Sequence, residues 1–361
     1  MKFDVFSLGE IAKIRYGKNQ KNVQSDNGDI PIYGTGGLMG YASRSLYNYP
    51  SVLIGRKGTI GKVSYVEHPF WTIDTLFYTE INENIVIPKF LYYLMSLIDL
   101  NAYDEGTTIP SLRTETLNRL ELRIPSIDYQ KKILNILNPI YMKIQANSVI
   151  NKNLEEQAKA IYQNMFIDNP DNDWNEGSLS DIANITMGQS PSGSSYNDDG
   201  IGTVFFQGRA EFGFRFPTIR LYTTNPKRMA SANDILMSVR APVGDLNIAH
   251  EDCCIGRGLA AICSKTSYQS FILYTMFSLK KQLNVFNGEG TVFGSINRNS
   301  LNDMPILIPS DEQIEKFELI VAPMDAAIRN NYDEICRLQI VRDSLLTRLM
   351  SGELDVSNLD I

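Results

Sequence analysis

The sequence predicts a mixed α/β (α+β) fold, in which two similar globular parts are separated by two long antiparallel coiled-coil helices with a pseudo-twofold internal repeat. Two observations predict it. Segments recur in the same order at a nearly constant offset, and each copy ends in a long seven-residue apolar repeat. With 361 residues, 43% of them hydrophobic, the chain is long enough for two or three domains that each bury a core.

The internal repeat covers most of the chain. Ser-Leu-Gly-Glu-Ile-Ala-Lys-Ile at 7–14 returns as Ser-Leu-Ser-Asp-Ile-Ala-Asn-Ile at 178–185, and Gly17 falls on Gly188. Later matches pair 52–54 with 235–237, 105–107 with 289–291, and Ile-Pro-Ser at 124–126 with 308–310. A collinear series of this length indicates two copies of one structural unit.

Each copy begins with short β-like segments broken by Gly, Pro and Asn. We expect strands at 51–54, 62–66, 203–207 and 234–238, and helices at 88–97 and 268–283. Ser126 and Ser310 are placed to act near helix N-caps, with Asp128 and Glu312 in the following first turns. Each globular part should therefore end where a long helix begins.

The two helical stretches carry the clearest periodicity. Apolar positions spaced alternately by four and three run from Ile133 to Met165 and again, 184 residues later, from Phe317 to Leu349. About five heptads at ~1.5 Å per residue predict a pair of coiled-coil helices roughly 50–55 Å long. Pro139 and Pro323 either kink these helices near their starts or mark the point where regular helix begins.

Asn147 and Asn331 occupy the same heptad position, near the middle of each stretch. If the helices pair antiparallel about a pseudo-twofold axis, equivalent residues meet only at the midpoint. We therefore expect the two amides to face each other and set the helix register, although a hydrated interface between the helices would also tolerate two asparagines. Six apolar residues lie off the seam and need another surface to bury them: Ile136, Tyr141, Val149, Ile150, Tyr162 and Phe166.

The net charge of −7 argues against general affinity for polyanions, but the charge is unevenly distributed. Residues 312–361 carry 5 basic and 10 acidic side chains, whereas the stretch from Lys13 to Lys21 is basic without an acid before Asp26. The N-terminus lacks a signal-peptide core, and no stretch has about 20 apolar residues for a membrane span. A cytoplasmic protein with four reduced cysteines is expected.

Taken together, these features resemble the DNA-specificity subunit of Type I restriction-modification systems, over essentially the whole chain. The resemblance rests on the duplicated Ser-Leu-x-Glu/Asp-Ile-Ala openings and the Ile-Pro-Ser exits. It also rests on the helix endings at 160–166 and 345–354 and on Cys-Ile-Gly-Arg-Gly at 254–258. It implies that 1–127 and 169–311 are target-recognition domains, that 128–168 and 312–352 are long helices, and that 353–361 is a tail.

The resemblance further implies a non-catalytic subunit whose two domains each read one half of a bipartite, asymmetric DNA target. The helices would set the spacer and dock two adenine-methyltransferase subunits, and motor-nuclease subunits would join them for restriction. S-adenosylmethionine, ATP and Mg would then act only in those partners, and this chain would hold no cofactor or metal. Half-sites addressed by two readers on rigid helices would lie about one DNA turn apart, near 34 Å.

Candidate DNA contacts come from residue chemistry alone, since Arg and Lys suit guanine edges and phosphates and Asn and Gln suit adenine. In the first copy they are Lys13, Arg15, Lys18, Lys21, Arg44, Arg56, Lys57 and Thr59, with the glycine-rich 34–37 loop allowing close approach. In the second they are Gln189, Ser190, Gln207, Arg209, Arg215, Arg240 and Arg257. Arg240 aligns with Lys57, so the same turn carries a basic residue in both copies.

Enzymatic alternatives are weaker. Asn-Pro-Ile-Tyr at 138–141 lacks the second proline of an amino-methyltransferase motif, and the glycine loop at 55–63 has the wrong spacing for a phosphate loop. His68 and His250 have no nucleophile partner in the sequence, so structural roles are expected. Two other functions stay open: a coiled-coil scaffold with protein-binding globular ends, and a specificity subunit for a fused methyltransferase-nuclease that cuts outside its site.

Overall fold

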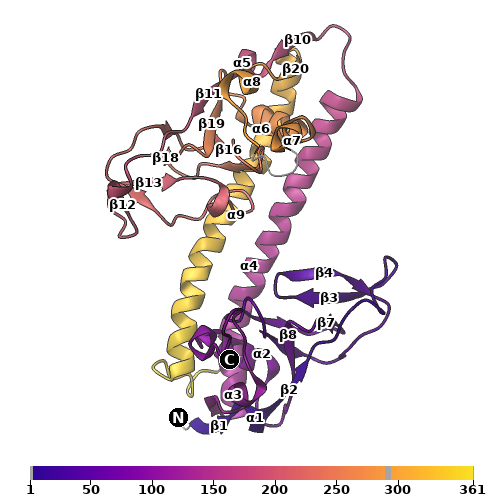
Figure 1. Ribbon diagram of the computed structural model, residues 1–361, viewed down its shortest axis with the longest axis vertical. Helices are drawn as coiled ribbons and strands as arrows, with labels where there is room; N and C mark the ends of the chain where they lie inside the picture. The colour runs from indigo at the N-terminus through magenta and orange to yellow at the C-terminus, as the bar shows by residue number, and fades with distance from the viewer. Residues whose placement is uncertain (1–2, 289–293, 361) are drawn as a thin grey trace. The chain divides into compact units, whose positions relative to one another are not determined.

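The computed structural model describes residues 3–288 and 294–360, so the repeat match at 289–291 lies outside the described residues. The chain forms two compact units (Figure 1). The first unit contains residues 1–146 and 334–361, and the second contains 147–333. The two long helices, α4 (Ile127–Tyr162) and α9 (Asp311–Ser351), each contribute one part to each unit.

The first unit is built on a four-stranded sheet with strand order β2-β8-β5-β6 and a three-stranded sheet with order β4-β3-β7. The strands and helices are β1 (Phe3–Ser7), α1 (Leu8–Ile11), β2 (Ala12–Tyr16), β3 (Ile30–Gly34), β4 (Gly37–Ala42), β5 (Ser51–Gly55), β6 (Val63–Val66), β7 (Trp71–Thr72), β8 (Leu76–Ile81), α2 (Pro88–Ser96), η1 (Leu100–Tyr103), α3 (Thr114–Asn118) and β9 (Glu121–Pro125). Strand β1 pairs antiparallel with β9, and β3 pairs parallel with β7.

The second unit repeats this plan with a four-stranded sheet of order β11-β19-β16-β17 and a five-stranded sheet of order β12-β14-β13-β18-β15. Its elements are η2 (Gln163–Asp168), β10 (Asn175–Ser178), α5 (Leu179–Ile182), β11 (Ala183–Met187), η3 (Gly193–Ser195), β12 (Tyr196–Asn197), β13 (Thr203–Phe206), η4 (Arg209–Glu211), β14 (Tyr222–Thr223), β15 (Met229–Ala230), β16 (Ile235–Ser238), β17 (Leu246–Ile248), β18 (Cys253–Ile255), β19 (Leu259–Ser264), α6 (Gln269–Ser278), α7 (Lys280–Asn284), η5 (Val285–Asn287), α8 (Arg298–Asn302) and β20 (Pro305–Ile308). The parallel pair recurs as β13 with β18. The mixed α/β fold with an internal repeat is thus confirmed.

The repeated Ser-Leu-x-Glu/Asp motif opens a single helical turn in each unit. The Glu10 carboxylate accepts a hydrogen bond from the Ser7 backbone N–H at 2.6 Å, and Asp181 accepts one from Ser178 at 2.7 Å. These capping boxes satisfy amides that the short helices α1 and α5 leave free. The motif therefore recurs because both copies need the same local turn.

The strands predicted at 51–54, 62–66, 203–207 and 234–238 appear as β5, β6, β13 and β16, with ends shifted by one residue. The predicted helix at 268–283 divides into α6 and α7 at Leu279. Ser126 lies at the start of α4, where its hydroxyl accepts from the Tyr129 N–H at 3.4 Å. Pro139 and Pro323 lie inside continuous helices, so the alternative in which regular helix begins at these prolines is wrong.

Within each unit, α4 and α9 run antiparallel. In the second unit Tyr162 contacts Phe317 with ring centroids 5.7 Å apart, while Asn151, further back on α4, bonds to Ile328 and Asn331 further along α9. In the first unit, Lys143 pairs with Glu334, and Tyr129 reaches Asp355 in the C-terminal tail. Residues later in α4 contact residues earlier in α9, so the two helices are antiparallel.

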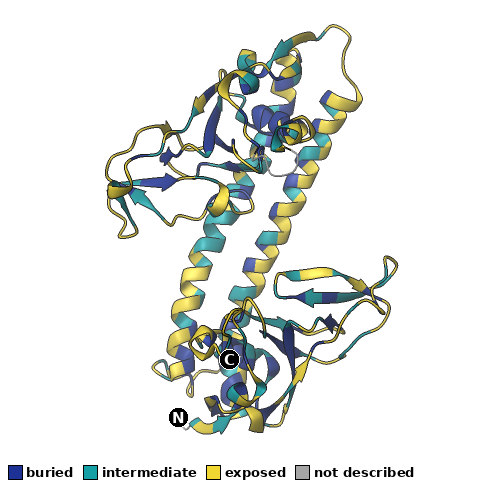
Figure 2. Cartoon of the chain, in the orientation of Figure 1, coloured by how far each residue is buried: buried dark blue, intermediate teal, exposed yellow. Residues whose placement is uncertain are grey.

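The helices complete the hydrophobic core of each unit (Figure 2). Ile133 and Leu137 of α4 and Leu349 of α9 lie in the core of the first unit, and Val356 of the tail is fully buried there. Tyr162 and Phe166, which needed a burial surface, pack in the second core. Val149 and Ile150 stay 56% and 46% exposed. Among the described residues, no helix is long and apolar enough to cross a membrane.

Candidate nucleic-acid interface

Four segments of the second unit meet at the end of the four-stranded sheet where β11 and β16 finish and β19 begins. The Gly188 N–H donates to Leu259 O at 2.9 Å, and the Gln189 N–H donates to Ile255 O at 3.0 Å. The loop between β18 and β19 is tied to the exit of β13 because the Gly256 N–H donates to Phe206 O at 2.8 Å. Backbone hydrogen bonds therefore hold these loops together.

Two glycines make this close packing possible. A Cβ on Gly188 would lie 2.2 Å from Gly256 O, and a Cβ on Gly256 would lie 2.8 Å from the Gln207 Cα. Both contacts are with backbone, which cannot move aside as the end of a flexible side chain can. We call the surface formed by Gln189, Ser190, Gln207, Arg240 and Arg257 the second reading face.

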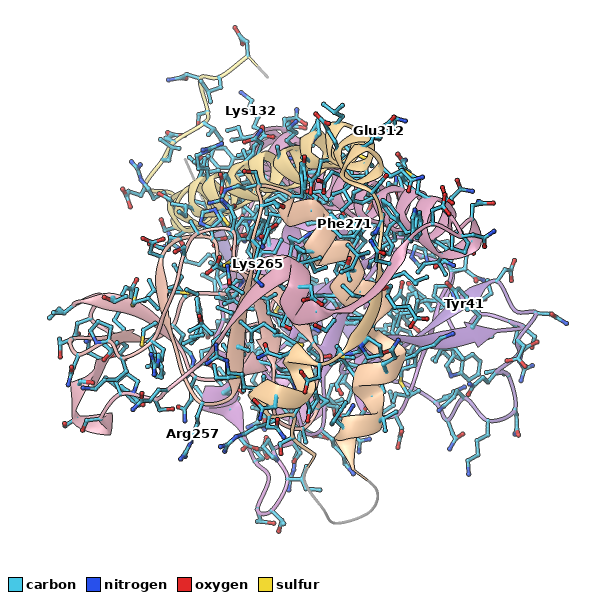
Figure 3. All side chains as sticks on the ribbon, turned by 90° about the horizontal axis from the view of Figure 1, so that it is seen from above. Tyr41, Lys132, Arg257, Lys265, Phe271 and Glu312 are labelled. Carbon is cyan, nitrogen blue, oxygen red and sulfur yellow. The ribbon has the colours of Figure 1, made fainter. Side chains whose placement is uncertain are left out.

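The side chains of the second reading face are mostly exposed. Gln189, Gln207, Arg240 and Arg257 are exposed, and Ser190 accepts a hydrogen bond on its Oγ from the Arg257 N–H at 3.2 Å. Arg257 projects outward from the ribbon in Figure 3. Arg240 and Arg257 line one open pocket of about 570 Å³ together with Ser295 and Asn297. This face offers amide and guanidinium groups, which suit base edges, in one place.

The first unit has the same backbone arrangement. The Gly17 N–H donates to Leu76 O at 3.0 Å, the Lys18 N–H to Thr72 O at 2.8 Å, and the Ile73 N–H to Tyr33 O at 3.1 Å. These bonds repeat those of Gly188, Gln189 and Gly256 in the second unit, one for one. Lys18 is therefore the structural equivalent of Gln189.

The alignment of Lys57 with Arg240 has the same structural basis. Lys57 forms an isolated β-bridge with Ser111, and Arg240 forms one with Ser295. The next residue in each segment donates its backbone N–H to the residue before that serine. Gly58 donates to Pro110 O and Ala241 to Gly294 O, both at 2.9 Å. A basic side chain thus occurs at one equivalent place in the two units.

Arg56 has a fixed position in the first unit. Its Nη1 donates to the backbone oxygen of Asp74 at 2.8 Å, and its guanidinium lies 4.8 Å from the ring centroid of Tyr16. Stacking on an aromatic face reduces the conformational freedom that an arginine loses when it binds. The roles of Tyr16 and Asp74 were not predicted, since neither residue stands out in the sequence by type or spacing.

The predicted residues of the first copy do not form one cluster. Lys18, Arg56 and Lys57 belong to the segments that meet at the end of the sheet, as do Gly34 at the end of β3 and Asp74 after β7. We call the surface formed by these five residues the first reading face. Thr59 lines two pockets beside it. Lys13 and Arg15 lie along β2, where Arg15 pairs with Glu80 at 3.0 Å. Three further predicted positions lie outside this face: Lys21 precedes β3, Gly37 begins β4, and Arg44 follows β4.

Two predicted residues of the second copy are engaged within the protein. Arg209 is exposed but pairs with Asp245, which also binds the Lys280 Nζ at 2.7 Å. Burial raises the pKa of Asp245, but the hydrogen bonds and charges of Lys280 and Arg209 outweigh it and hold that pKa below its ordinary value. Arg209 therefore anchors its loop to the turn between β16 and β17.

The prediction that Arg215 binds DNA is wrong, because its side chain is only 3% exposed. Its Nη2 lies 3.0 Å from Asp325 Oδ1 and donates to the Tyr274 hydroxyl at 3.0 Å, while its Nε lies 3.4 Å from Glu155 Oε2. Burial acts to lower the pKa of Arg215, and Tyr274, Asp325 and Glu155 outweigh it and raise that pKa. Arg215 ties its loop to both long helices of the second unit.

The helix-register prediction involves Asn331 and Asn147. The Asn331 Nδ2 donates to Asn151 Oδ1 at 2.8 Å, and Asn151 Nδ2 donates to Ile328 O at 3.2 Å. Asn147, one turn before Asn151, is 1% exposed. A buried amide network is thus present in the second unit, and the register role of Asn147 and Asn331 stays a prediction.

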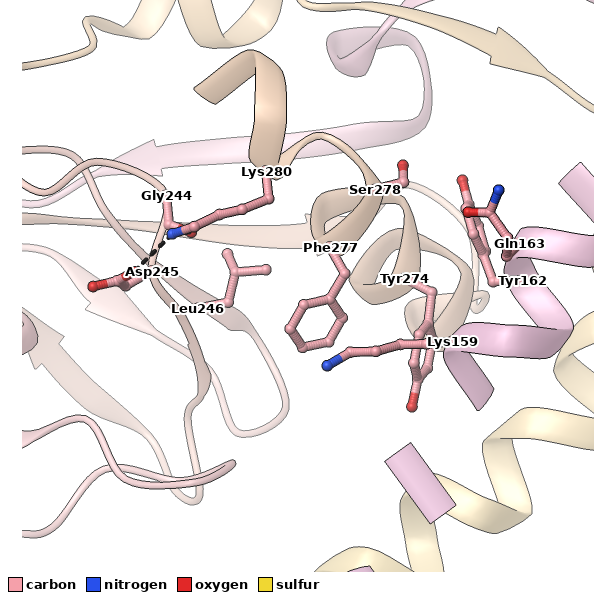
Figure 4. Close-up of a pocket in the computed structure, with 10 residues that line it drawn as sticks. All are labelled: Lys159, Tyr162, Gln163, Gly244, Asp245, Leu246, Tyr274, Phe277, Ser278 and Lys280. Carbon is pink, nitrogen blue, oxygen red and sulfur yellow. Dashed lines mark hydrogen bonds and ion pairs between the residues drawn. The ribbon is translucent and has the colours of Figure 1, made fainter. Parts of the chain in front are cut away.

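A pocket of about 490 Å³ in the second unit lies between α4, the α6–α7 helices and the β16–β17 turn (Figure 4). Its two lysines are already paired. Lys159 binds Glu155 at 2.5 Å, and Lys280 binds Asp245. His250, outside this pocket, has its Nε2 2.7 Å from Asp333 Oδ1, whereas His68 of the first unit lies 3.3 Å from the Tyr33 hydroxyl.

Comparison with known proteins relates this chain to one protein family. The model described as Type I restriction modification DNA specificity domain matches residues 1–156 and 171–331. A Methanocaldococcus jannaschii protein with the provisional name type I restriction enzyme MjaX specificity subunit is 31% identical over 304 residues, which are 76% of this chain and 70% of that protein. The type I restriction enzyme HindI specificity subunit of Haemophilus influenzae is 23% identical, over 76% of this chain and 79% of its own length.

The fold is also found in a solved structure. The crystal structure of the Type-I restriction-modification system S subunit from M. genitalium matches with a TM-score of 0.62 and covers 97% of this chain and 96% of its own. At 16% sequence identity, this match shows a common fold.

Proposed function

Because the chain belongs to the Type I restriction-modification DNA specificity family and has two target-recognition domains, we propose that each domain reads one half of a bipartite, asymmetric DNA target. One observation supports this most directly. The backbone hydrogen bonds at the two reading faces correspond one for one, while the side chains differ, as with Lys18 and Gln189. A shared scaffold with different polar side chains suits two different half-sites.

We propose the domain boundaries 1–127 and 169–311 for the two readers, with helices at 128–168 and 312–352 and a tail at 353–361. The observed helices α4 and α9 have 36 and 41 residues, or about 54 and 62 Å at ~1.5 Å per residue. Helices longer than one turn of DNA, about 34 Å, have the length needed to set the spacer between half-sites.

Exposed apolar side chains on the long helices support docking of two adenine-methyltransferase subunits. Val149 and Ile150 of α4 are 56% and 46% exposed, and Ile340 of α9 is 71% exposed. Apolar side chains of this size on a helix surface favour association with another protein. Ile340→Glu is expected to reduce co-purification of the methyltransferase, whereas the charge-matched change Gln339→Glu on the neighbouring exposed position is not.

In this proposal the chain contributes recognition and no chemistry. The methyltransferase subunits supply S-adenosylmethionine chemistry, and motor-nuclease subunits supply ATP- and Mg-dependent restriction. The assembly would act on chromosomal and incoming DNA in the cytoplasm.

The test is modification-sensitive sequencing of genomic DNA from cells that carry this gene and its methyltransferase gene, compared with cells that lack this gene alone. Loss of methyladenine at one split motif in the deletion is expected, and it would define both half-sites and the spacer. Unchanged methylation would count against DNA reading and favour a coiled-coil scaffold whose globular ends bind protein.

A further inference from the structure

The reading faces contain four pairs of equivalent positions, one from each segment that meets at the end of the sheet. In both units the parallel strand pair fixes two of them, because Phe206 opposes Ile255 as Tyr33 opposes Thr72. We infer that these four positions determine which bases each domain reads: Gln189 and Lys18, Gln207 and Gly34, Arg240 and Lys57, Arg257 and Asp74. The inference rests on the proposed function.

Hydrogen bonds hold the backbone of the second reading face, while the side chains of Gln207, Arg240 and Arg257 are exposed. The residues before and after Arg257 are bonded to the exit of β13, through Gly256 N–H to Phe206 O at 2.8 Å and Gly258 N–H to Gln207 O at 3.2 Å. A recognition surface gains precision when its backbone is rigid and its variable groups project from it. The second reading face has this construction.

Gln207 and Arg257 are the central pair of the second reading face. The close approach of Gly256 to the Gln207 Cα sets their backbones side by side, and both side chains are exposed. A glutamine amide pairs with N6 and N7 of adenine, and a guanidinium pairs with O6 and N7 of guanine. The second half-site should therefore contain an adenine read by Gln207 and, close to it, a guanine read by Arg257.

The arginines of this face are available for such contacts. Within the part of the chain that the structure describes, Arg240 and Arg257 have no ion pair within 4.0 Å, whereas Arg209 pairs with Asp245 and Arg220 with Glu211 at 2.6 Å. A surface arginine already held by a carboxylate must lose that partner before it can bind a base. Among the described residues, Arg240 and Arg257 thus differ from Arg209 and Arg220, which are held by carboxylates.

The first reading face carries different chemistry at the same positions. Gly34 has no side chain where Gln207 has an amide, and Asp74 has a carboxylate, which only accepts hydrogen bonds, where Arg257 has a donor. A carboxylate suits the cytosine amino group. Arg56, stacked on Tyr16 and bonded to the Asp74 backbone, supplies the guanidinium of this face. The two half-sites should therefore differ in sequence.

The experiment uses the full chain assembled with its methyltransferase subunits. Methylation rates are measured on duplexes in which each base pair of both half-sites is changed in turn. Arg257→Ala is expected to reduce discrimination at one G·C pair of the second half-site by about 10- to 100-fold, and Gln207→Ala at one A·T pair, with the first half-site profile unchanged.

Two further variants sharpen this test. Arg257→Lys keeps the charge but loses the two-pronged donor, so discrimination should fall while overall binding is retained. Asp74→Arg should change preference in the first half-site only. The control is Lys265→Ala, an exposed cation at the opposite end of β19 (Figure 3), which should leave both profiles unchanged.

The outcomes separate this inference from the proposed function. If the unaltered complex methylates a bipartite motif but Arg257→Ala and Gln207→Ala have the same profiles as the unaltered chain, the inference is overturned and the function stands. A uniform loss of rate at every position, in variants that fold normally, would also overturn it. If the unaltered complex shows no sequence preference at all, both fail.

Discussion

Arg215 provides the sharpest test of how the second unit is held together. Its guanidinium is 3% exposed and is the counter-ion of Asp325 at 3.0 Å and of Glu155 at 3.4 Å. Arg215→Ala would leave Asp325 in the same low-dielectric surroundings without its cationic partner, whereas Glu155 keeps its ion pair with Lys159. Removing one member of a buried pair costs about 3–5 kcal/mol, so the second unit should melt roughly 6–20 °C lower.

The two tryptophans allow the second unit to be observed separately. Trp71 belongs to the first unit and Trp174 to the second, where its ring centroid lies 5.8 Å from that of Phe166. In a Trp71→Phe background, Trp174 fluorescence reports unfolding of the second unit alone. The charge-matched control is Lys316→Ala, whose exposed pairing with Glu312 on α9 should leave the transition unchanged.

The stability of the Arg215→Ala variant should depend on pH in a defined direction. Burial raises the pKa of Asp325, and Arg215 opposes that rise, so the pKa should rise further in Arg215→Ala. A carboxyl with a higher pKa in the folded chain than in the unfolded chain binds its proton more tightly when folded. The variant should therefore lose stability as the pH rises through that raised pKa and recover part of it as the pH falls.

The reasoning would be refuted if Arg215→Ala unfolded at the same denaturant concentration as the Trp71→Phe background at pH 7. It would also be refuted if the cost of Arg215→Met were undiminished when combined with Asp325→Asn. The double change leaves no unpaired charge at this position, so it should cost less than Arg215→Met alone.

Three further predictions concern the faces and the tail. The isolated chain should bind DNA weakly. In gel-shift titrations, Lys18→Ala and Lys57→Ala should each reduce the slope of log affinity against log salt concentration by about 1. Unchanged slopes would show that neither lysine lies in the DNA interface. Gly256→Ala should abolish recognition of the second half-site in the methylation assay, because the added Cβ would lie 2.8 Å from the Gln207 Cα. Gly193→Ala is the control and should leave recognition unchanged, because its added Cβ would have no atom within 4 Å. Val356→Ala should destabilise the first unit by about 1.5–2.5 kcal/mol, seen as earlier unfolding of Trp71 in a Trp174→Phe background, because Val356 is fully buried; an unshifted transition would show that the tail contributes nothing.

The repeat made most of the architecture predictable. Heptad spacing identified both long helices, and β-like segments placed β5, β6, β13 and β16 within one residue. These signals are local, since periodicity and capping depend on neighbours in sequence. Ser126 and Ser310 also predict the starts of α4 and α9, whereas Pro139 and Pro323 left open a later start of regular helix, which the structure does not show.

The candidate site was predictable only in part. Residue type selected Gln189, Gln207 and Arg257, which the structure exposes on one face, and their DNA contacts stay a prediction. The repeat paired Lys57 with Arg240, and both form equivalent β-bridges. Residue type also selected Arg215, which is buried. Sequence could not separate Arg215 from Arg257, because Asp325, which binds Arg215, lies 110 residues away along the chain.

The sequence by itself determined that the chain is built from two copies of one unit, each closed by a heptad helix, because repeats and periodicity are written along the chain. The tertiary structure decided the pairing of Asn331 with Asn151 and the burial of Arg215 between two helices. It also decided which side chains share a reading face, since long-range hydrogen bonds, such as Gly256 to Phe206, bring distant segments together. Chemical type is local, but exposure and neighbours are set by the packing of the whole unit.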